Sequence, residues 1–302
     1  MSRFMEAASR QARLVSWALV LSIYAVWGLA TWFHQMIPFW ALLPVGAVLI
    51  AWHGSFQHEA VHDHFSSRRW LNDLIAYPPL ALWLPYAIYR RTHRAHHNLN
   101  ILTDPRRDPE SFYVDQASWR RLPSPFRFLL VWHNTLPGRV LIGPVLVIGQ
   151  FLFSEIRALL CGDYRHLGAW LLHLPATAVV LAWLLLVADM PLWVYVSCFV
   201  LPGLSLTLVR SFAEHKAAHT PEERTAIVEA GPFFSLLFLN NNLHFAHHKR
   251  PDLPWQALPA YYRQHRKRLL NENGGLCYRG GYREIATRFL ARPVDRPAHP
   301  FL

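Results

Sequence analysis

The feature that most constrains the fold of this chain is an uncharged stretch of 20 residues, Leu14 to Phe33. A helix of that length spans about 30 Å, which is the thickness of the hydrocarbon core of a bilayer. The stretch is longer than the apolar core of a signal peptide, and no small-residue cleavage site follows it. It therefore predicts a transmembrane helix that is retained in the protein.

Three more apolar runs are long enough to cross a bilayer. A short break, residues 34–37, separates the first run from the second, and little more than Asp189 separates the third from the fourth. Each pair is therefore expected to form a tight helical hairpin. The sequence thus predicts an all-α integral membrane protein with four transmembrane helices in two hairpins. The predicted spans cover about residues 14–33, 38–56, 167–188 and 190–209.

Two weaker apolar stretches are interrupted by helix breakers. Residues 74–89 hold three prolines, and residues 140–153 contain Gly143, Pro144 and Gly149. Both stretches are short for a span, so they are expected to form helices at the membrane interface. The proline-rich end of the chain, from residue 291, is expected to lie loose on the surface.

The positions of the basic residues predict the orientation of the spans. Arginine precedes the first span at Arg3, Arg10 and Arg13, and it is frequent in residues 57–139 and 210–290, whereas the hairpin tips have none. Because lysine and arginine concentrate on the cytoplasmic side of a membrane, both termini are expected to be cytoplasmic. The two basic regions would then form a helical cap on that side.

Composition agrees with a chain that lies partly in the bilayer. Hydrophobic residues make up 53% of the chain and charged residues 16%, against about 25% charged in soluble domains. The mean hydropathy is only +0.12, so much of the chain still meets water. The net charge of +11 fits anionic lipid headgroups or an acidic electron carrier, and no nucleic-acid partner is expected. One domain, residues 1–302, is predicted.

Histidine is the unusual component of the composition, with 18 residues, whereas the three cysteines have no paired spacing and predict neither a disulfide framework nor a thiolate metal site. Twelve of the histidines fall in four short windows, each just outside an apolar run on the predicted cytoplasmic side. These windows contain His53, His58, His62 and His64; His93, His96 and His97; His215 and His219; and His244, His247 and His248.

The spacing within the windows predicts metal ligands. His58 and His62 are four residues apart, and two triplets repeat a spacing of three and four, so each set projects from one face of a helix. Imidazole is a common ligand of transition metals. Eight or nine imidazoles exceed the needs of one ion and suit two ions side by side. His215 is the first histidine after the fourth span and would face the others, whereas His53, His64 and His219 have no firm role.

Three of these segments, HEAVH, HRAHH and HFAHH, resemble the three histidine boxes of the membrane fatty acid desaturase superfamily, and their flanking strings resemble its bacterial desaturase branch. The resemblance implies an oxidoreductase with two iron ions and O₂ as co-substrate, with no other bound cofactor and no catalytic residue beyond the metal site. It also implies a lipid or fatty acyl substrate, an electron donor such as ferredoxin with its reductase, and a bacterial inner membrane. The implied ligands are His58, His62, His93, His96, His97, His215, His244, His247 and His248.

Acidic and amide side chains beside the boxes are expected to orient the ligand rings through hydrogen bonds. The candidates are Glu59, Asp63, Asp104, Asp108, Glu110, Glu214 and Asn240 to Asn242.

Other activities share this metal chemistry. Hydroxylation, ketolation and oxidative decarboxylation to a terminal alkene all begin with the same hydrogen abstraction, and the sequence leaves them open beside desaturation. A haem-binding electron carrier or a metal transporter belongs to a different class. Such proteins place ligands inside facing spans or near the bilayer midplane, and only His173 would serve in the middle of a span of this chain.

Overall fold

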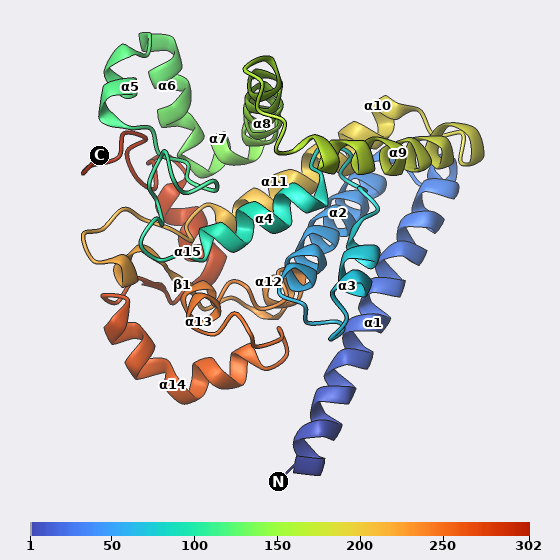
Figure 1. Ribbon diagram of the computed structural model, residues 1–302, viewed down its shortest axis with the longest axis horizontal. Coiled ribbons are helices and arrows are strands. Elements are labelled where there is room, and N and C mark those ends of the chain that lie inside the picture. Colours follow the sequence, from blue (N-terminus) through green and yellow to red (C-terminus); the bar gives the residue numbers. More distant parts are fainter. Residues whose placement is uncertain (1) are drawn as a thin grey trace. The chain divides into compact units, whose positions relative to one another are not determined.

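The computed structural model describes residues 2–302, with side chains from Gln11 onward, so the side chains of Arg3 and Arg10 lie outside the described part (Figure 1). The described chain is mostly helical. It divides into two compact units: unit 1 comprises Met1–Arg90 and Val145–Leu206, and unit 2 comprises Arg91–Pro144 and Thr207–Leu302. The chain passes between the units within helices α4, α8 and α11.

Unit 1 contains the long apolar helices. Its elements, with the three shared helices, are α1 (Ser2–Trp32), η1 (His34–Met36), α2 (Phe39–Val61), α3 (Arg69–Ala76), α4 (Tyr86–His96), α8 (Gly143–Leu160), α9 (Leu167–Ala182), η2 (Trp183–Val187), α10 (Leu192–Tyr195), η3 (Val196–Val200) and α11 (Leu201–Ser211). Both η2 and η3 are single π-helical turns: η2 extends the end of α9, and η3 joins α10 to α11.

Five helices in the described residues are long and apolar enough to cross a membrane. Four of them agree with the predicted runs to within about five residues: Gln11–Trp32, Phe39–Val61, Leu167–Val187 and Leu192–Ser211. The fifth, Gly143–Leu160, extends seven residues beyond the stretch that we expected at the interface, and it meets the same criteria of length and hydropathy. The count of four spans in two hairpins therefore stays a prediction.

The predicted interfacial helix over residues 74–89 is wrong. Helix α3 ends at Ala76 and α4 begins at Tyr86, with no regular structure between them. The segment contains Pro78, Pro79 and Pro85. Proline has no N–H to donate and its ring clashes with the preceding turn, so this apolar segment cannot continue a helix.

The core of unit 1 combines close helix packing with buried hydrogen bonds. The indole Nε1–H of Trp27 donates to the hydroxyl of Tyr195 over 3.0 Å, and that hydroxyl donates to the carbonyl of Leu80 over 2.6 Å. Helix α2 packs closely against η3 and α11 at a glycine, which has no side chain to hold the two helices apart. A Cβ added to Gly203 would lie 2.4 Å from the Cβ of Ile50.

This close approach gives a testable packing prediction. The substitution Gly203→Ile is expected to lower the melting temperature of the detergent-purified protein, because overpacking a helix contact costs about 1–3 kcal/mol. Gly149→Ile is the matched control, since a Cβ at Gly149 in α8 meets no atom within 4 Å. Equal melting temperatures for the two variants would contradict the close packing of α11 on α2.

Unit 2 contains shorter helices and one small sheet. Besides its parts of α4, α8 and α11, its elements are α5 (Gln116–Arg121), α6 (Ser124–His133), α7 (Leu136–Leu141), η4 (Pro221–Arg224), β1 (Ile227–Val228), α12 (Pro232–Leu237), α13 (His244–Lys249), α14 (Leu258–Glu272), β2 (Cys277–Tyr278) and α15 (Gly281–Phe289). Strands β1 and β2 pair in parallel, with Ile227 opposite Cys277.

The segment that contains β1 organises unit 2. Ile227 belongs to a buried apolar cluster with residues of α13 and α14, including Phe245 and Leu269. The N–H of Ala226 donates to the carbonyl of Glu214 over 2.8 Å, and the carbonyl of Ala226 accepts from the N–H of Phe245 over 3.0 Å. The backbone of Ala226 is therefore hydrogen-bonded both to the residue before His215 and to the start of α13.

The end of the chain is fixed in place, contrary to our prediction of a loose segment. Val114 forms a parallel bridge with Ala298. The N–H of His299 donates to the carbonyl of Val114 over 2.8 Å, and the N–H of Gln116 donates to the carbonyl of Leu302 over 2.9 Å. These backbone hydrogen bonds outweigh the effect of the prolines, which break helices but do not prevent an extended segment from pairing.

Candidate metal centre

Local helical structure positions the two histidine triplets of unit 2 as their spacing predicts. His93 and His96 lie in the last turn of α4, and the N–H of His97 extends that turn by donating to the carbonyl of His93 over 3.2 Å. The second triplet begins α13 at His244 and is buried. His215 follows α11 and forms an isolated antiparallel bridge with Thr225.

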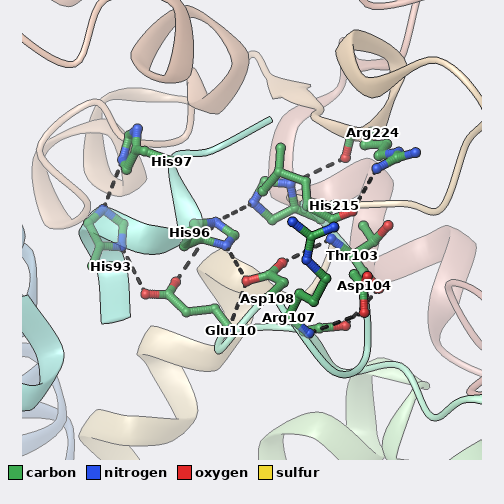
Figure 2. Close-up of polar contacts among 12 residues, drawn as sticks. His93, His96, His97, Thr103, Asp104, Arg107, Asp108, Glu110, His215 and Arg224 are labelled. Carbon is green, nitrogen blue, oxygen red and sulfur yellow. Dashed lines mark hydrogen bonds and ion pairs between the residues drawn. The ribbon is translucent and has the colours of Figure 1, made fainter. Parts of the chain in front are cut away.

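Four of the predicted ligands come together in what we call the His215 cluster: His96, His215, His244 and His248. The Nε2 atom of His215 lies 2.9 Å from Nε2 of His96 and 3.0 Å from Nε2 of His244. The Nε2 atoms of His244 and His248 are 3.1 Å apart. Figure 2 shows how His96 and His215 point toward each other.

The other ring nitrogens of this cluster identify the tautomers. Nδ1 of His96 lies 2.8 Å from a carboxylate oxygen of Asp108, and Nδ1 of His215 lies 3.2 Å from the carbonyl of Arg224 (Figure 2). Nδ1 of His244 lies 3.0 Å from the side-chain oxygen of Asn241. These oxygens accept hydrogen bonds, so each Nδ1 donates. A neutral imidazole carries one N–H, and the three Nε2 atoms therefore present lone pairs.

Three lone pairs that face one another at about 3 Å repel unless a cation lies between them. Imidazole nitrogens bind a transition metal at about 2.0–2.1 Å, and two such nitrogens at right angles are about 3 Å apart. The nitrogen separations of 2.9–3.1 Å match that arrangement. The donor set of the His215 cluster therefore fits a transition-metal ion.

A second convergent set, the His93 cluster, consists of His93, His97 and His247. The Nε2 atom of His97 lies 3.1 Å from Nε2 of His93 and 3.1 Å from Nε2 of His247. Nδ1 of His93 donates to the carboxylate of Glu110 over 2.9 Å (Figure 2). The same carboxylate lies 3.9 Å from Nε2 of His96, so Glu110 contacts ligand candidates of both clusters.

His58 and His62 belong to unit 1 and form a pair there. His58 is in the last turn of α2 and His62 caps that helix, which brings the ring centroids to 5.0 Å. Nδ1 of His58 lies 3.6 Å from the carboxylate of Glu59. The predicted helical pairing of these two histidines is confirmed, whereas their role as ligands stays a prediction.

Burial keeps most of the unit 2 histidines neutral. It lowers the pKa of His97 to about 2 and lowers those of His93, His215, His244 and His248. Neutral imidazoles have the lone pair that a metal requires.

His96 is the exception among the unit 2 histidines. Burial acts to lower the pKa of His96, but the carboxylates of Glu110, Asp108 and Glu214 outweigh it and raise the pKa. Burial raises the pKa of Glu214 itself to about 7, which weakens its share of this effect. The carboxylates of Asp108 and Glu110 beside His96 stabilise a cation there, either the protonated ring or a metal ion that replaces the proton.

Several side chains that we expected to orient the rings do contact them. Asp108 and Glu110 accept hydrogen bonds from His96 and His93, and Asn241 accepts one from His244. Glu214 lies 3.5 Å from Nδ1 of His244. The predicted contacts are confirmed for these residues.

Other candidates have a different role. Asp104 accepts hydrogen bonds from the backbone N–H groups of Arg106 and Arg107 (Figure 2), and none from a histidine in the described residues, so its predicted contact with a ring is wrong. Asp63 forms an ion pair with Arg90 of 2.7 Å. Glu59 bonds to His64 and also lies 3.6 Å from Nδ1 of the predicted ligand His58. Asn240 and Asn242 bond elsewhere, to the carbonyls of Trp255 and Val228.

Two residues beside the His215 cluster were not predicted. The carbonyl of Arg224 orients His215, while its guanidinium donates to the carbonyls of Leu102 and Ala218 over 3.0 and 2.8 Å. Arg210 lies 3.2 Å from the carboxylate of Glu214. A backbone carbonyl leaves no signal in the sequence, whereas the i, i+4 spacing of Arg210 and Glu214 could have indicated their pair.

The histidines without a firm role lie outside both clusters. His53 contacts the hydroxyl of Tyr24 at 3.4 Å, and His64 donates to Glu59 over 2.7 Å. The ring of His219 packs against Phe301 with centroids 3.9 Å apart. His173, the histidine considered as a ligand in the middle of a span, contacts the carbonyl of Leu82 at 2.9 Å.

Two comparisons with known proteins found similar sequences. The family model described as "Fatty acid desaturase" matches residues 37–279. A curated protein of Nostoc sp. (strain 36), described as "sn-1 acyl-lipid omega-3 desaturase (ferredoxin)", is 34% identical over 106 residues. That alignment covers 33% of this chain and 26% of the Nostoc protein, about a quarter of its length.

Proposed function

This chain belongs to the fatty acid desaturase family, and on that premise we propose that it is an O₂-dependent enzyme that introduces a double bond into the hydrocarbon chain of a fatty acyl lipid. Membership of the family makes the chain a membrane oxidoreductase. The further proposal is that two iron ions are its resident metals. It treats residues 1–302 as one catalytic domain in which both units take part.

The observation that carries this proposal is the arrangement of His96, His215 and His244. Their Nδ1 protons are held by oxygen acceptors, and their Nε2 lone pairs face one another within about 3 Å. When the three rings are neutral, these lone pairs can bind one transition-metal cation together, in a buried place beside the carboxylates of Asp108 and Glu110.

Two sites follow from the two clusters. In the proposal, the His215 cluster and the His93 cluster each hold an iron, and His58 and His62 are further ligands supplied by unit 1. Imidazole suits iron among the first-row metals, and the family membership favours it over zinc or copper. When bound, two irons supply with O₂ and two external electrons an oxidising power that no side chain has.

The surrounding residues prepare the ligands. Asp108, Asn241 and the carbonyl of Arg224 accept from Nδ1 of His96, His244 and His215, so that the Nε2 lone pairs of these three neutral rings are directed inward. Acceptors of this kind fix the ring orientation and raise the basicity of a ligand. Burial of His96, His244 and His248 excludes bulk water from the reacting side of the rings.

The proposal also covers the partners and location of the enzyme. The apolar helices indicate that the substrate chain enters from lipid. The Nostoc relative is named as a ferredoxin-dependent acyl-lipid desaturase, and we extend a ferredoxin-type donor with its reductase to this chain. We place the enzyme in a bacterial inner membrane with both termini and the histidine clusters on the cytoplasmic side, where such a donor is found.

Product analysis tests the reaction class. Expression in a bacterial host of known lipid composition, with a ferredoxin and its reductase supplied, is expected to yield a fatty acid with a new double bond. The His96→Ala variant should yield none, because it removes a ligand of the His215 cluster. Fatty acids and hydrocarbons are measured by gas chromatography and mass spectrometry.

Other products would change the reaction that we assign to the enzyme. A hydroxylated or keto fatty acid, or a terminal alkene, would contradict desaturation while leaving the metal chemistry in place. A purified protein with a haem absorption band and without non-haem iron would contradict the metal sites themselves.

A further inference from the structure

Unit 2 contains a buried arginine that forms no ion pair with the described residues and is a member of neither histidine cluster. Arg139, in α7, is 2% exposed. One of its terminal nitrogens, NH2, donates to the side-chain oxygen of Asn134 over 3.1 Å. Its Nε and NH1 groups have no hydrogen-bond partner among residues 11–302. An unsatisfied N–H in a protein interior is rare and costly, so these two donors call for an explanation.

Aromatic rings surround the guanidinium. Its central carbon lies 4.0 Å from the ring centroid of Phe112 and 5.6 Å from that of Phe212. Aromatic faces attract the cation, but they accept none of its in-plane N–H groups. Burial lowers the pKa of Arg139 to about 9, so the side chain keeps its positive charge at neutral pH.

His133 adds a second unsatisfied polar group to the same place. It is 6% exposed, and its Nε2 atom has no hydrogen-bond partner in the described residues. A Cβ added to Gly143 would lie 3.5 Å from this Nε2 atom and 3.5 Å from Cδ of Arg139. The two side chains therefore converge beside Gly143, where the side chain of Leu208 also packs, with its Cδ1 2.8 Å from the position of such a Cβ. Burial, and then the charge of Arg139, lower the pKa of His133 to about 3, so its ring is neutral.

We propose that Arg139, with Asn134 and His133, forms a buried binding site for an anionic oxygen group, a carboxylate or a phosphate, that comes from a ligand outside the chain. The planar guanidinium presents paired N–H donors that match these oxygen pairs. The second N–H of NH2, beside the one bonded to Asn134, forms such a pair with Nε on one edge of the guanidinium or with NH1 on the other, and both Nε and NH1 are without a partner in the described residues. The neutral imidazole of His133 can donate one further hydrogen bond to the same group.

Two sources can deliver this chemistry to a membrane protein. A free fatty acid offers a carboxylate, and a phospholipid offers a phosphate. The site does not depend on the proposed reaction, because it involves neither histidine cluster. Its test therefore needs no iron and no turnover.

The experiment compares ligands that differ only in the anionic group. The full-length protein in a neutral detergent is titrated with oleate against oleyl alcohol, and with dioleoyl phosphatidic acid against dioleoylglycerol, while the melting temperature is recorded. The anionic member of at least one pair is expected to raise the melting temperature more than its neutral counterpart, because a ligand that binds the folded state stabilises it. The pair that responds identifies the source.

Variants assign the effect to Arg139. Arg139→Met is expected to weaken the apparent affinity for the anionic ligand roughly 10- to 100-fold, as the loss of charge-assisted hydrogen bonds predicts. Arg139→Lys keeps the charge but loses the paired donors, so it should also bind less tightly than the wild type. Arg120→Met is the control, since Arg120 is an exposed arginine of the same unit and its replacement should change nothing.

The ligand-free proteins give an independent readout. Without anion, Arg139→Met should be at least as stable as the wild type, because it removes an uncompensated buried charge. A lower melting temperature would show that the charge is already compensated within the chain and would overturn the proposal. Equal responses of the wild type to the anionic and neutral members of both pairs, or an Arg139→Met protein that responds like the wild type, would also overturn it.

Discussion

The His215→Ala substitution is expected to lower the iron content from two ions per chain to one and to reduce desaturation at least about 100-fold. His215 is the central member of its cluster, since its Nε2 atom lies within 3.0 Å of Nε2 of both His96 and His244. Its removal leaves three imidazoles and a gap between them. Loss of a group that merely orients a ligand costs about 10–100-fold, and loss of a ligand should cost more. Iron is measured by mass spectrometry of the purified protein.

His265→Ala is the matched control for this prediction. His265 lies in α14 of the same unit, and its Nδ1 bonds to the carbonyl of Tyr261 in its own helix over 2.9 Å. Its replacement should leave both the iron content and the product yield unchanged. Full iron content and activity in His215→Ala would remove His215 from the ligand set and contradict the site as proposed.

The Asp108→Ala substitution is expected to weaken iron binding roughly 10- to 100-fold. The carboxylate accepts the Nδ1–H of His96 and also the backbone N–H groups of Thr103 and Glu110. Its loss frees the ring of His96 and loosens the loop that carries Glu110. Titration of the metal-free protein with Fe²⁺ under anaerobic conditions measures the effect.

Two further variants separate ring orientation from loop stability. Asp108→Asn retains an oxygen that can accept from His96, so it should recover most of the iron affinity. Asp104→Ala removes a carboxylate of the same loop that accepts only from backbone N–H groups among the described residues, and it should lower stability slightly without changing iron affinity. Equal losses of affinity in Asp104→Ala and Asp108→Ala would mean that the loop, and not the contact with His96, determines binding.

The parts of the structure that depend on local spacing could be predicted from the sequence. The apolar runs correspond to helices, and the triplets that begin at His93 and His244 lie on single helical turns. Both signals depend on residues a few positions apart, where helical geometry alone determines which side chains share a face. The roles of Asp108 and Glu110 could also be predicted, because acidic residues beside ligand histidines often accept hydrogen bonds from their rings.

Features that depend on long-range contacts could not be predicted. His215 meets His96, which is 119 residues earlier in the chain, through backbone pairing with the segment around Ala226. The partner of its Nδ1 is a carbonyl, and every residue has one. Asp104 and Asp108 are the same residue type in the same loop, and only the turn of the backbone decides which of them reaches a histidine.

The β1 segment also determines when metal can be retained during biosynthesis. The backbone of Ala226 forms hydrogen bonds with the backbones of Glu214 and Phe245. Strand β1 itself pairs with Cys277 and Tyr278 of β2. Residues up to Tyr278 must therefore be translated before the backbone hydrogen bonds that position the ligand segments of unit 2 can all form. We expect iron to be inserted after translation into an already folded protein, so that iron-starved cells would accumulate a stable apoprotein that recovers activity on addition of Fe²⁺.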